Sequence, residues 1–273
     1  MQLKLIRHLW GVNEPWEVCF PKMKADGYVG IETPLIEAKD QERFASLMKS
    51  HGFEYVAMAF TGGDSVSAHV KSFEQQFRRA IEQGAIQLTA HTGLDRWAMR
   101  DCESFYKEAL EIERSHPNLP VAHETHRGRV FYSPWITRPL LEKFGSLKLC
   151  CDFSHWVCVA ERTNWDESDG AILRLCAQRC IHIHARVGYP EGPQVPDPSA
   201  AEYANELAAH EGWWDAIWRS QRSRGLPSST VTSEFGPPGY LHTLPHTNMP
   251  VADLNQVVNW MSRRVRARFD GQK

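Results

Sequence analysis

The chain has 273 residues, and its 31 lysine and arginine residues are nearly balanced by 33 aspartate and glutamate residues. This near-neutral charge gives no support to a broad surface for nucleic acid or for anionic membranes, so neither partner is expected. Hydrophobic residues make up 42% of the sequence, which is enough for a large core. At this length we expect one domain over residues 1–273.

The sequence also shows no membrane span or signal peptide, and its cysteines do not have the spacing of a zinc site. No stretch approaches the roughly 18 uninterrupted apolar residues of a membrane span, and the first residues lack the apolar region and cleavage site of a signal peptide. We therefore expect a cytoplasmic protein. The 7 cysteines are an odd number without paired Cys-x-x-Cys spacing, so we expect reduced core thiols rather than disulfides or a zinc site.

Short apolar runs, each followed by a longer amphipathic segment, recur along the chain. The runs predict strands at Leu3–Leu9, Gly27–Glu32, Tyr55–Phe60, Ile86–His91, Pro120–Thr125, Leu147–Phe153, Cys180–Arg186 and Thr230–Phe235. The segments between them predict helices near 14–25, 38–51, 64–84, 97–115, 134–145, 168–178, 200–222 and 251–267. Strict alternation of this kind favours parallel β/α units, and eight units can close into a (β/α)8 TIM barrel.

Two loops are longer than the others. They span residues 187–199 and 236–250, and each follows a predicted strand. Long loops inside a compact domain are more often binding loops than idle connections, so both are expected at the rim where a barrel carries its chemistry.

Four polar residues stand at the ends of consecutive predicted strands. They are Glu124, Asp152, His184 and Glu234. Burial of each carboxylate after an apolar run would be costly unless a cation or a donor compensates it. In a barrel these four strand ends point toward one place, and three carboxylates with one imidazole form a hard, oxygen-rich ligand set. The pattern predicts one divalent metal ion, with Mn²⁺ expected and Mg²⁺, Co²⁺ or Zn²⁺ as alternatives.

The seventh predicted strand carries three polar residues on one face. His182, His184 and Arg186 alternate with apolar or small neighbours, so an extended strand projects them together. There are two explanations for these residues. Either their polar groups form hydrogen bonds inside the barrel, or they lie beside a metal ion and a substrate. Arg186 could hold a phosphate, carboxylate or hydroxyl group, or it could pair with a rim carboxylate such as Glu191.

Asp152-Phe153-Ser154-His155 resembles the Asp-x-x-His motif of the xylose isomerase-like TIM barrels, and the strand ends at Glu124, His182-x-His184 and Glu234 extend the likeness over nearly the whole chain. This family includes sugar isomerases and epimerases and, more distantly, AP endonucleases. The resemblance implies that Glu124, Asp152, His184 and Glu234 are the metal ligands. It further implies that His155 contacts a substrate oxygen and that His182 lies one layer deeper as support.

Two further residues are candidates for the substrate pocket. Glu32 resembles the glutamate on the second strand of this family and is expected to hydrogen-bond within the pocket, and His91 ends the fourth strand. Five aromatic residues are expected either to form an apolar wall of the substrate pocket or to be part of the hydrophobic core. They are His8, Trp10, Trp156, Tyr189 and Tyr240.

The chain departs from the nuclease branch of the family. Nucleases of that branch need histidines on the third and fourth strands and an Asp-x-His after the seventh. Here Val56–Thr61 contains no histidine, and the last motif is replaced by Asp197-Pro198-Ser199, so only His91 remains. A site for one metal ion follows, and DNA repair is not expected.

The resemblance implies that Glu124 and Glu234 act as acid and base, one removing and the other returning a proton next to a metal-polarised carbonyl. The leading hypothesis is a metal-dependent isomerase or epimerase of a sugar, sugar acid or similar keto compound. The alternatives are a dehydratase or lyase of the dehydroshikimate dehydratase type and a barrel that only binds a ligand. By resemblance, the chain is also expected to form a homodimer or homotetramer.

Overall fold

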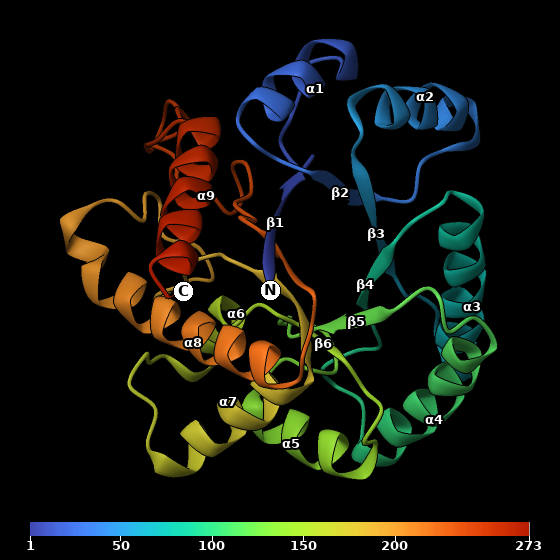
Figure 1. The fold of residues 1–273 in the computed structure, drawn as a ribbon. Coiled ribbons are helices and arrows are strands. Elements are labelled where there is room, and N and C mark those ends of the chain that lie inside the picture. Colours follow the sequence, from blue (N-terminus) through green and yellow to red (C-terminus); the bar gives the residue numbers. More distant parts are fainter. Residues whose placement is uncertain (273) are drawn as a thin grey trace.

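The structure is a computed structural model that describes residues 1–272, and it contains a closed barrel of parallel strands (Figure 1). Neighbouring strands pair in chain order, and β8 closes the ring against β1. The strands are β1 (Gln2–His8), β2 (Gly30–Pro34), β3 (Glu54–Phe60), β4 (Gln87–His91), β5 (Val121–Glu124), β6 (Leu149–Cys151), β7 (Cys180–His184) and β8 (Ser228–Thr232). The predicted (β/α)8 fold is therefore confirmed.

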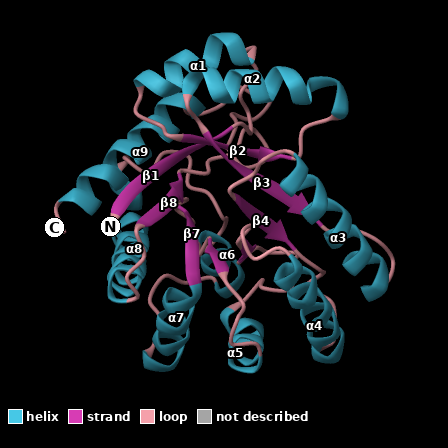
Figure 2. Cartoon of the chain, turned by 45° about the vertical axis from the view of Figure 1, so that its right-hand side comes forward, coloured by secondary structure: helices cyan, strands magenta, loops and turns pink. Residues whose placement is uncertain are grey.

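Helices surround the barrel on its outside (Figures 1 and 2). They are α1 (Trp16–Ala25), α2 (Gln41–His51), α3 (Val66–Glu82), α4 (Met99–Ser115), α5 (Pro134–Lys143), α6 (Ser154–Ala160), α7 (Glu167–Arg179), α8 (Ala204–Ser223) and α9 (Leu254–Asp270), with short 3-10 turns η1 (Ala38–Asp40) and η2 (Ala201–Tyr203). Side-chain caps fix three helix starts: Ser65, Asp166 and Asp253 each accept from a backbone N–H in the first turn.

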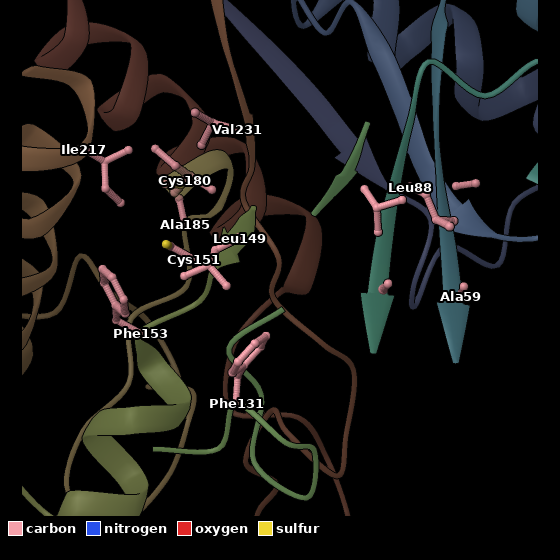
Figure 3. Packing of buried hydrophobic residues seen from close by; sticks show 14 of the residues in the cluster. Ala59, Leu88, Phe131, Leu149, Cys151, Phe153, Cys180, Ala185, Ile217 and Val231 are labelled. Carbon is pink, nitrogen blue, oxygen red and sulfur yellow. The ribbon is translucent and has the colours of Figure 1, made fainter. Parts of the chain in front are cut away.

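The main apolar core lies between the strands and the helices. Figure 3 shows Leu149 and Cys151 of β6 next to Cys180 of β7, with which Leu149 pairs, and Ile217 of α8 belongs to the same buried cluster. Successive strand residues point to opposite faces, so the intervening Cys150 turns into the barrel, where it lies near His182 and His184. Strand parity therefore separates an apolar outer layer from a polar barrel interior.

All seven cysteines are unpaired, and six of them are buried. Within residues 1–272, no helix has the length and apolar character needed to cross a membrane.

Strand boundaries near the polar residues differ from the prediction. β6 has three residues and is followed by α6, a helix that the sequence pattern did not predict. The reason is local: Asp152 Oδ1 accepts from the backbone N–H of Ser154 at 3.0 Å, which turns the chain into the helix. β2 begins at Gly30 rather than Gly27, because Gly27 has a φ of +88° in the turn after α1.

The two long loops are joined to each other. The Gln194 side chain donates to the carbonyl of Gly236 at 3.1 Å and accepts from its N–H at 2.7 Å. Gly236 also packs against the Trp10 indole so closely that an added Cβ would lie 2.3 Å from the ring. These contacts fix the loop after β8 over the end of the barrel where β1 ends.

Candidate active site

Four predicted ligands meet at the C-terminal end of the barrel. Glu124 ends β5, Asp152 follows β6, His184 ends β7 and Glu234 lies two residues after β8. All four are buried, and one ligand atom from each lies within 4.8 Å of the others. Parallel strands place their carboxyl ends on one side of the barrel, and this is why residues far apart in the sequence converge.

His184 presents one ring nitrogen to the carboxylates of this group. Its Nδ1 lies 3.4 Å from Glu124 Oε1 and 3.0 Å from Glu234 Oε2. Despite these short distances, the three atoms have no well-aligned hydrogen-bond partner among the described residues. Buried polar atoms that face one another without hydrogen bonds suit a common cation, so these residues fit a divalent metal ion.

The other nitrogen of His184 is held from below by Glu32. His184 Nε2 lies 3.1 and 3.2 Å from the two carboxylate oxygens of Glu32. Ionised Glu32 only accepts, so Nε2 carries a proton, and in neutral His184 the lone pair of Nδ1 faces the carboxylates of Glu124 and Glu234. Metal-binding histidines in proteins are typically oriented in this way by a carboxylate.

Glu32 thus lies beneath the ligand group. It was predicted as a residue of the substrate pocket, but it does not line the cavity above the ligand group. It accepts hydrogen bonds from Thr89 at 2.6 Å and Thr232 at 2.5 Å, and it lies 3.2 Å from His182 Nε2. His182 in turn contacts Thr230 Oγ1 at 2.8 Å. These buried partners form a polar layer below the site.

The pKa values of the carboxylates depend on how burial is compensated. Burial raises the pKa of Asp152 to about 6, even though Arg186 opposes the shift. For Glu234 burial acts in the same direction, but His184 and Arg186 outweigh it and lower the pKa to about 2. Burial is likewise outweighed at Glu124, where His91 and His184 bring the pKa well below its usual value.

The pKa of His184 reports the same concentration of negative charge. Burial alone would lower this pKa, but the Cys150 thiol and the surrounding carboxylates raise it well above its usual value. The site therefore favours positive charge, which a divalent cation would supply.

Arg186 lies against the ligand carboxylates. Its Nη2 is 2.5 Å from Asp152 Oδ2 and 3.2 Å from Glu234 Oε2, so Arg186 pairs with these residues and not with Glu191. The same nitrogen donates to His155 Nε2 at 2.7 Å. His155 is fully buried behind the guanidinium, so it reaches the pocket through Arg186.

A cavity of about 550 Å³ opens above these groups. It is lined by His8, Leu9, Trp10, Gly11, Thr33, Pro34, Met58, Phe60, His91, His126, Arg186, Glu234 and Tyr240. Of the aromatic wall residues named from the sequence, His8, Trp10 and Tyr240 are in this lining. Trp156 is buried in the core, where it donates to the Phe131 carbonyl, and Tyr189 packs against Tyr203 in the rim loop.

Histidines flank the two glutamates of the site. His91 Nε2 lies 2.7 Å from Glu124 Oε2, and His8 Nε2 lies 3.5 Å from Glu234 Oε1. The backbone N–H of Trp10 donates to His8 Nδ1 at 2.7 Å, which leaves the proton of neutral His8 on Nε2. Each glutamate thus has a histidine on its cavity side.

Sequence reasoning did not single out His126, Met58 or Phe60. His126 lies two residues after Glu124, a position at a strand end that could have signalled a site residue. It groups with His91 and Glu124 closely enough for the three to hold an ion, next to the main ligand group. Met58 and Phe60 come from β3, whose apolar sequence gave no signal.

Comparison with known protein families identifies the family of this chain. A model of the xylose isomerase-like TIM barrel family matches residues 15–206, and the chain belongs to that family. A search of curated proteins found no matching sequence.

Solved structures share the fold at low sequence identity. The 3-keto-D-glucoside 4-epimerase YcjR of E. coli superposes with a TM-score of 0.62 at 13% identity, over 97% of this chain and 100% of that chain. A sugar phosphate isomerase/epimerase of Parabacteroides distasonis gives 0.61 at 9% identity, over 97% and 94%. The probable 3-DHS dehydratase AsbF of Bacillus anthracis gives 0.60 at 13% identity, over 96% and 98%.

Proposed function

We propose that the protein is a divalent-metal-dependent isomerase or epimerase that acts on a sugar or a similar keto compound. The observation that carries this proposal is the convergence of Glu124, Asp152, His184 and Glu234 at consecutive strand ends, where the facing atoms of Glu124, His184 and Glu234 lack hydrogen bonds. Mn²⁺ suits this ligand set, and Mg²⁺, Co²⁺ or Zn²⁺ are the alternatives. The ion would supply Lewis-acid stabilisation of negative charge on a substrate oxygen.

Glu124 and Glu234 would carry the proton transfers. Their lowered pKa values keep both carboxylates ionised at neutral pH, so either can accept a proton from a carbon next to a carbonyl. They reach the site from β5 and from the loop after β8, which lets one remove the proton and the other return it from a different side. Return on the opposite face of the same carbon gives an epimer.

Arg186 and His155 would orient the substrate. Arg186 lines the cavity next to Glu234, where a guanidinium N–H can donate to a substrate hydroxyl or carbonyl oxygen. His155 would act by holding Arg186 in place through the contact at 2.7 Å. His91 and His8 would fix the outward oxygens of Glu124 and Glu234.

Two of the structural neighbours bear the names of sugar epimerases or isomerases, which supports this reaction class. A third is named as a dehydratase, and elimination of water would begin with the same proton removal. The dehydratase is therefore the second candidate.

Proton exchange in deuterated water separates these reactions. Protein loaded with Mn²⁺ is incubated with a panel of keto sugars and keto acids, and products are followed by mass spectrometry and NMR. The proposal predicts deuterium at a carbon next to the carbonyl and loss of the reaction on chelation. A product lighter by one water identifies a dehydratase, and the absence of exchange across the panel with no effect of chelator contradicts both.

A further inference from the structure

The cavity lining combines polar and apolar side chains. The polar ones are Glu234 and Arg186 with the neighbouring histidines, and the apolar or aromatic ones are Leu9, Trp10, Pro34, Met58, Phe60 and Tyr240. Phe60 is 41% exposed at the end of β3, and its ring stacks on His91 with centroids 4.3 Å apart. A large apolar surface facing a cavity gains stability when a ligand covers it, so these aromatic and apolar residues have the character of a binding wall.

The cavity lining has one positively charged side chain. Among the described residues that line it, Arg186 is the sole lysine or arginine, and Arg186 is paired with Asp152 and Glu234. Two neighbouring arginines are not in the lining: Arg129 donates to the carbonyl of Thr61 at 2.9 Å, and Arg127 lies over the Tyr240 ring at 5.2 Å. Phosphate groups are usually bound by free arginine or lysine side chains or by backbone N–H groups.

The charges of the site leave no excess of positive charge for a substrate. The carboxylates of Glu124, Asp152 and Glu234, with ionised Glu32 beneath them, outnumber the charges of one guanidinium and one divalent ion. An anionic substrate would gain no net attraction in such a site and would lose hydration on entry.

We propose that the substrate is uncharged and unphosphorylated, and that it carries an apolar group that packs against Phe60 and Trp10 in the cavity. This inference rests on the proposed function and names its substrate class. The volume of about 550 Å³ is in keeping with it. Pockets of about 300–1,000 Å³ bury ligands of drug size, so a sugar with an attached ring fits.

Calorimetric titration of the Mn²⁺-loaded protein tests this substrate class. The probes are phenyl β-D-glucopyranoside, methyl β-D-glucopyranoside, glucose 6-phosphate and inorganic phosphate. We expect the phenyl glycoside to bind about tenfold more tightly than the methyl glycoside, from contact of the phenyl ring with the aromatic wall. Both phosphate compounds should bind more weakly than the methyl glycoside.

A matched pair of variants locates the effect. Phe60→Ala should remove most of the preference for the phenyl glycoside. Ile86→Ala should keep it, because Ile86 is similarly exposed at 39% but lies outside the cavity. Tighter binding of glucose 6-phosphate, an unchanged preference in Phe60→Ala, or no binding of the phenyl glycoside up to about 10 mM would each overturn the inference.

Repeating the titration without metal separates this inference from the proposed function. Phe60 and Trp10 are not metal ligands, so the preference for the phenyl glycoside should persist in metal-free protein. A phenyl preference in a protein that binds no divalent metal would leave the inference standing and remove the proposed function. Metal-dependent proton exchange with phosphorylated substrates alone would do the reverse.

Discussion

Replacement of Glu32 by glutamine tests how the ligand histidine is held. Both carboxylate oxygens of Glu32 lie within 3.2 Å of His184 Nε2. Glutamine keeps the shape but removes the charge, and its amide N–H₂ cannot accept the proton of Nε2. Loss of such a supporting carboxylate typically weakens metal binding by about 10- to 100-fold, which is about 1.4–2.7 kcal/mol. We expect this loss for Mn²⁺ in Glu32→Gln.

The assay is a titration with Mn²⁺ in which free ion is followed by electron paramagnetic resonance, with circular dichroism as a check of folding. Glu113→Gln is the matched control, because it removes a carboxylate that lies 2.9 Å from His123 Nε2, outside the ligand group. Thr232→Val removes one donor to Glu32 and keeps the carboxylate, so its effect should be smaller. A folded Glu32→Gln protein that binds Mn²⁺ as tightly as Glu113→Gln refutes the reasoning.

Three further predictions concern catalysis, pH and packing. Glu124→Gln and Glu234→Gln should each lower the rate of proton exchange by at least about a hundredfold, and a rate near that of the unaltered protein would contradict their role. His210 is buried in α8, and burial lowers its pKa to about 4, so its contribution to stability is complete above the unfolded pKa of about 6.5 and is lost as pH falls toward 4, in total about 3 kcal/mol. In urea unfolding, the stability lost between pH 7 and pH 5.5 should therefore be about 1 kcal/mol larger in the unaltered protein than in His210→Gln, and an equal loss in both proteins would refute this assignment. Gly236→Ala should cost about 1–3 kcal/mol in thermal unfolding because its Cβ would meet the Trp10 ring, and unchanged stability would show that the ring can move.

The sequence was informative about the fold because its signal is periodic. Apolar runs alternating with amphipathic segments correspond to the eight strands and the helices around them, and the closed ring follows from the number of units. The convergence of Glu124, Asp152, His184 and Glu234 could be predicted because each follows or ends a strand, and parallel strands end on one side.

Details that depend on hydrogen bonding and side-chain direction were not predictable in the same way. α6 begins where Asp152 accepts from the N–H of Ser154, a contact that apolar periodicity does not report. The sequence suggested Glu191 as one possible partner of Arg186, whereas the structure pairs Arg186 with Asp152 and Glu234. The path of the rim loop that carries Glu191 depends on tertiary contacts, which the sequence pattern does not report. Phe60 belongs to an apolar strand, so its exposure in the cavity could be known only from the structure.

The most direct test of the metal site is anomalous X-ray scattering from crystals of the protein grown with Mn²⁺. The proposed function predicts one strong anomalous peak, which marks an Mn²⁺ ion bound by Glu124, Asp152, His184 and Glu234, with His184 binding through Nδ1. No peak at these residues, or a peak only at the neighbouring group of His91, Glu124 and His126, would contradict it.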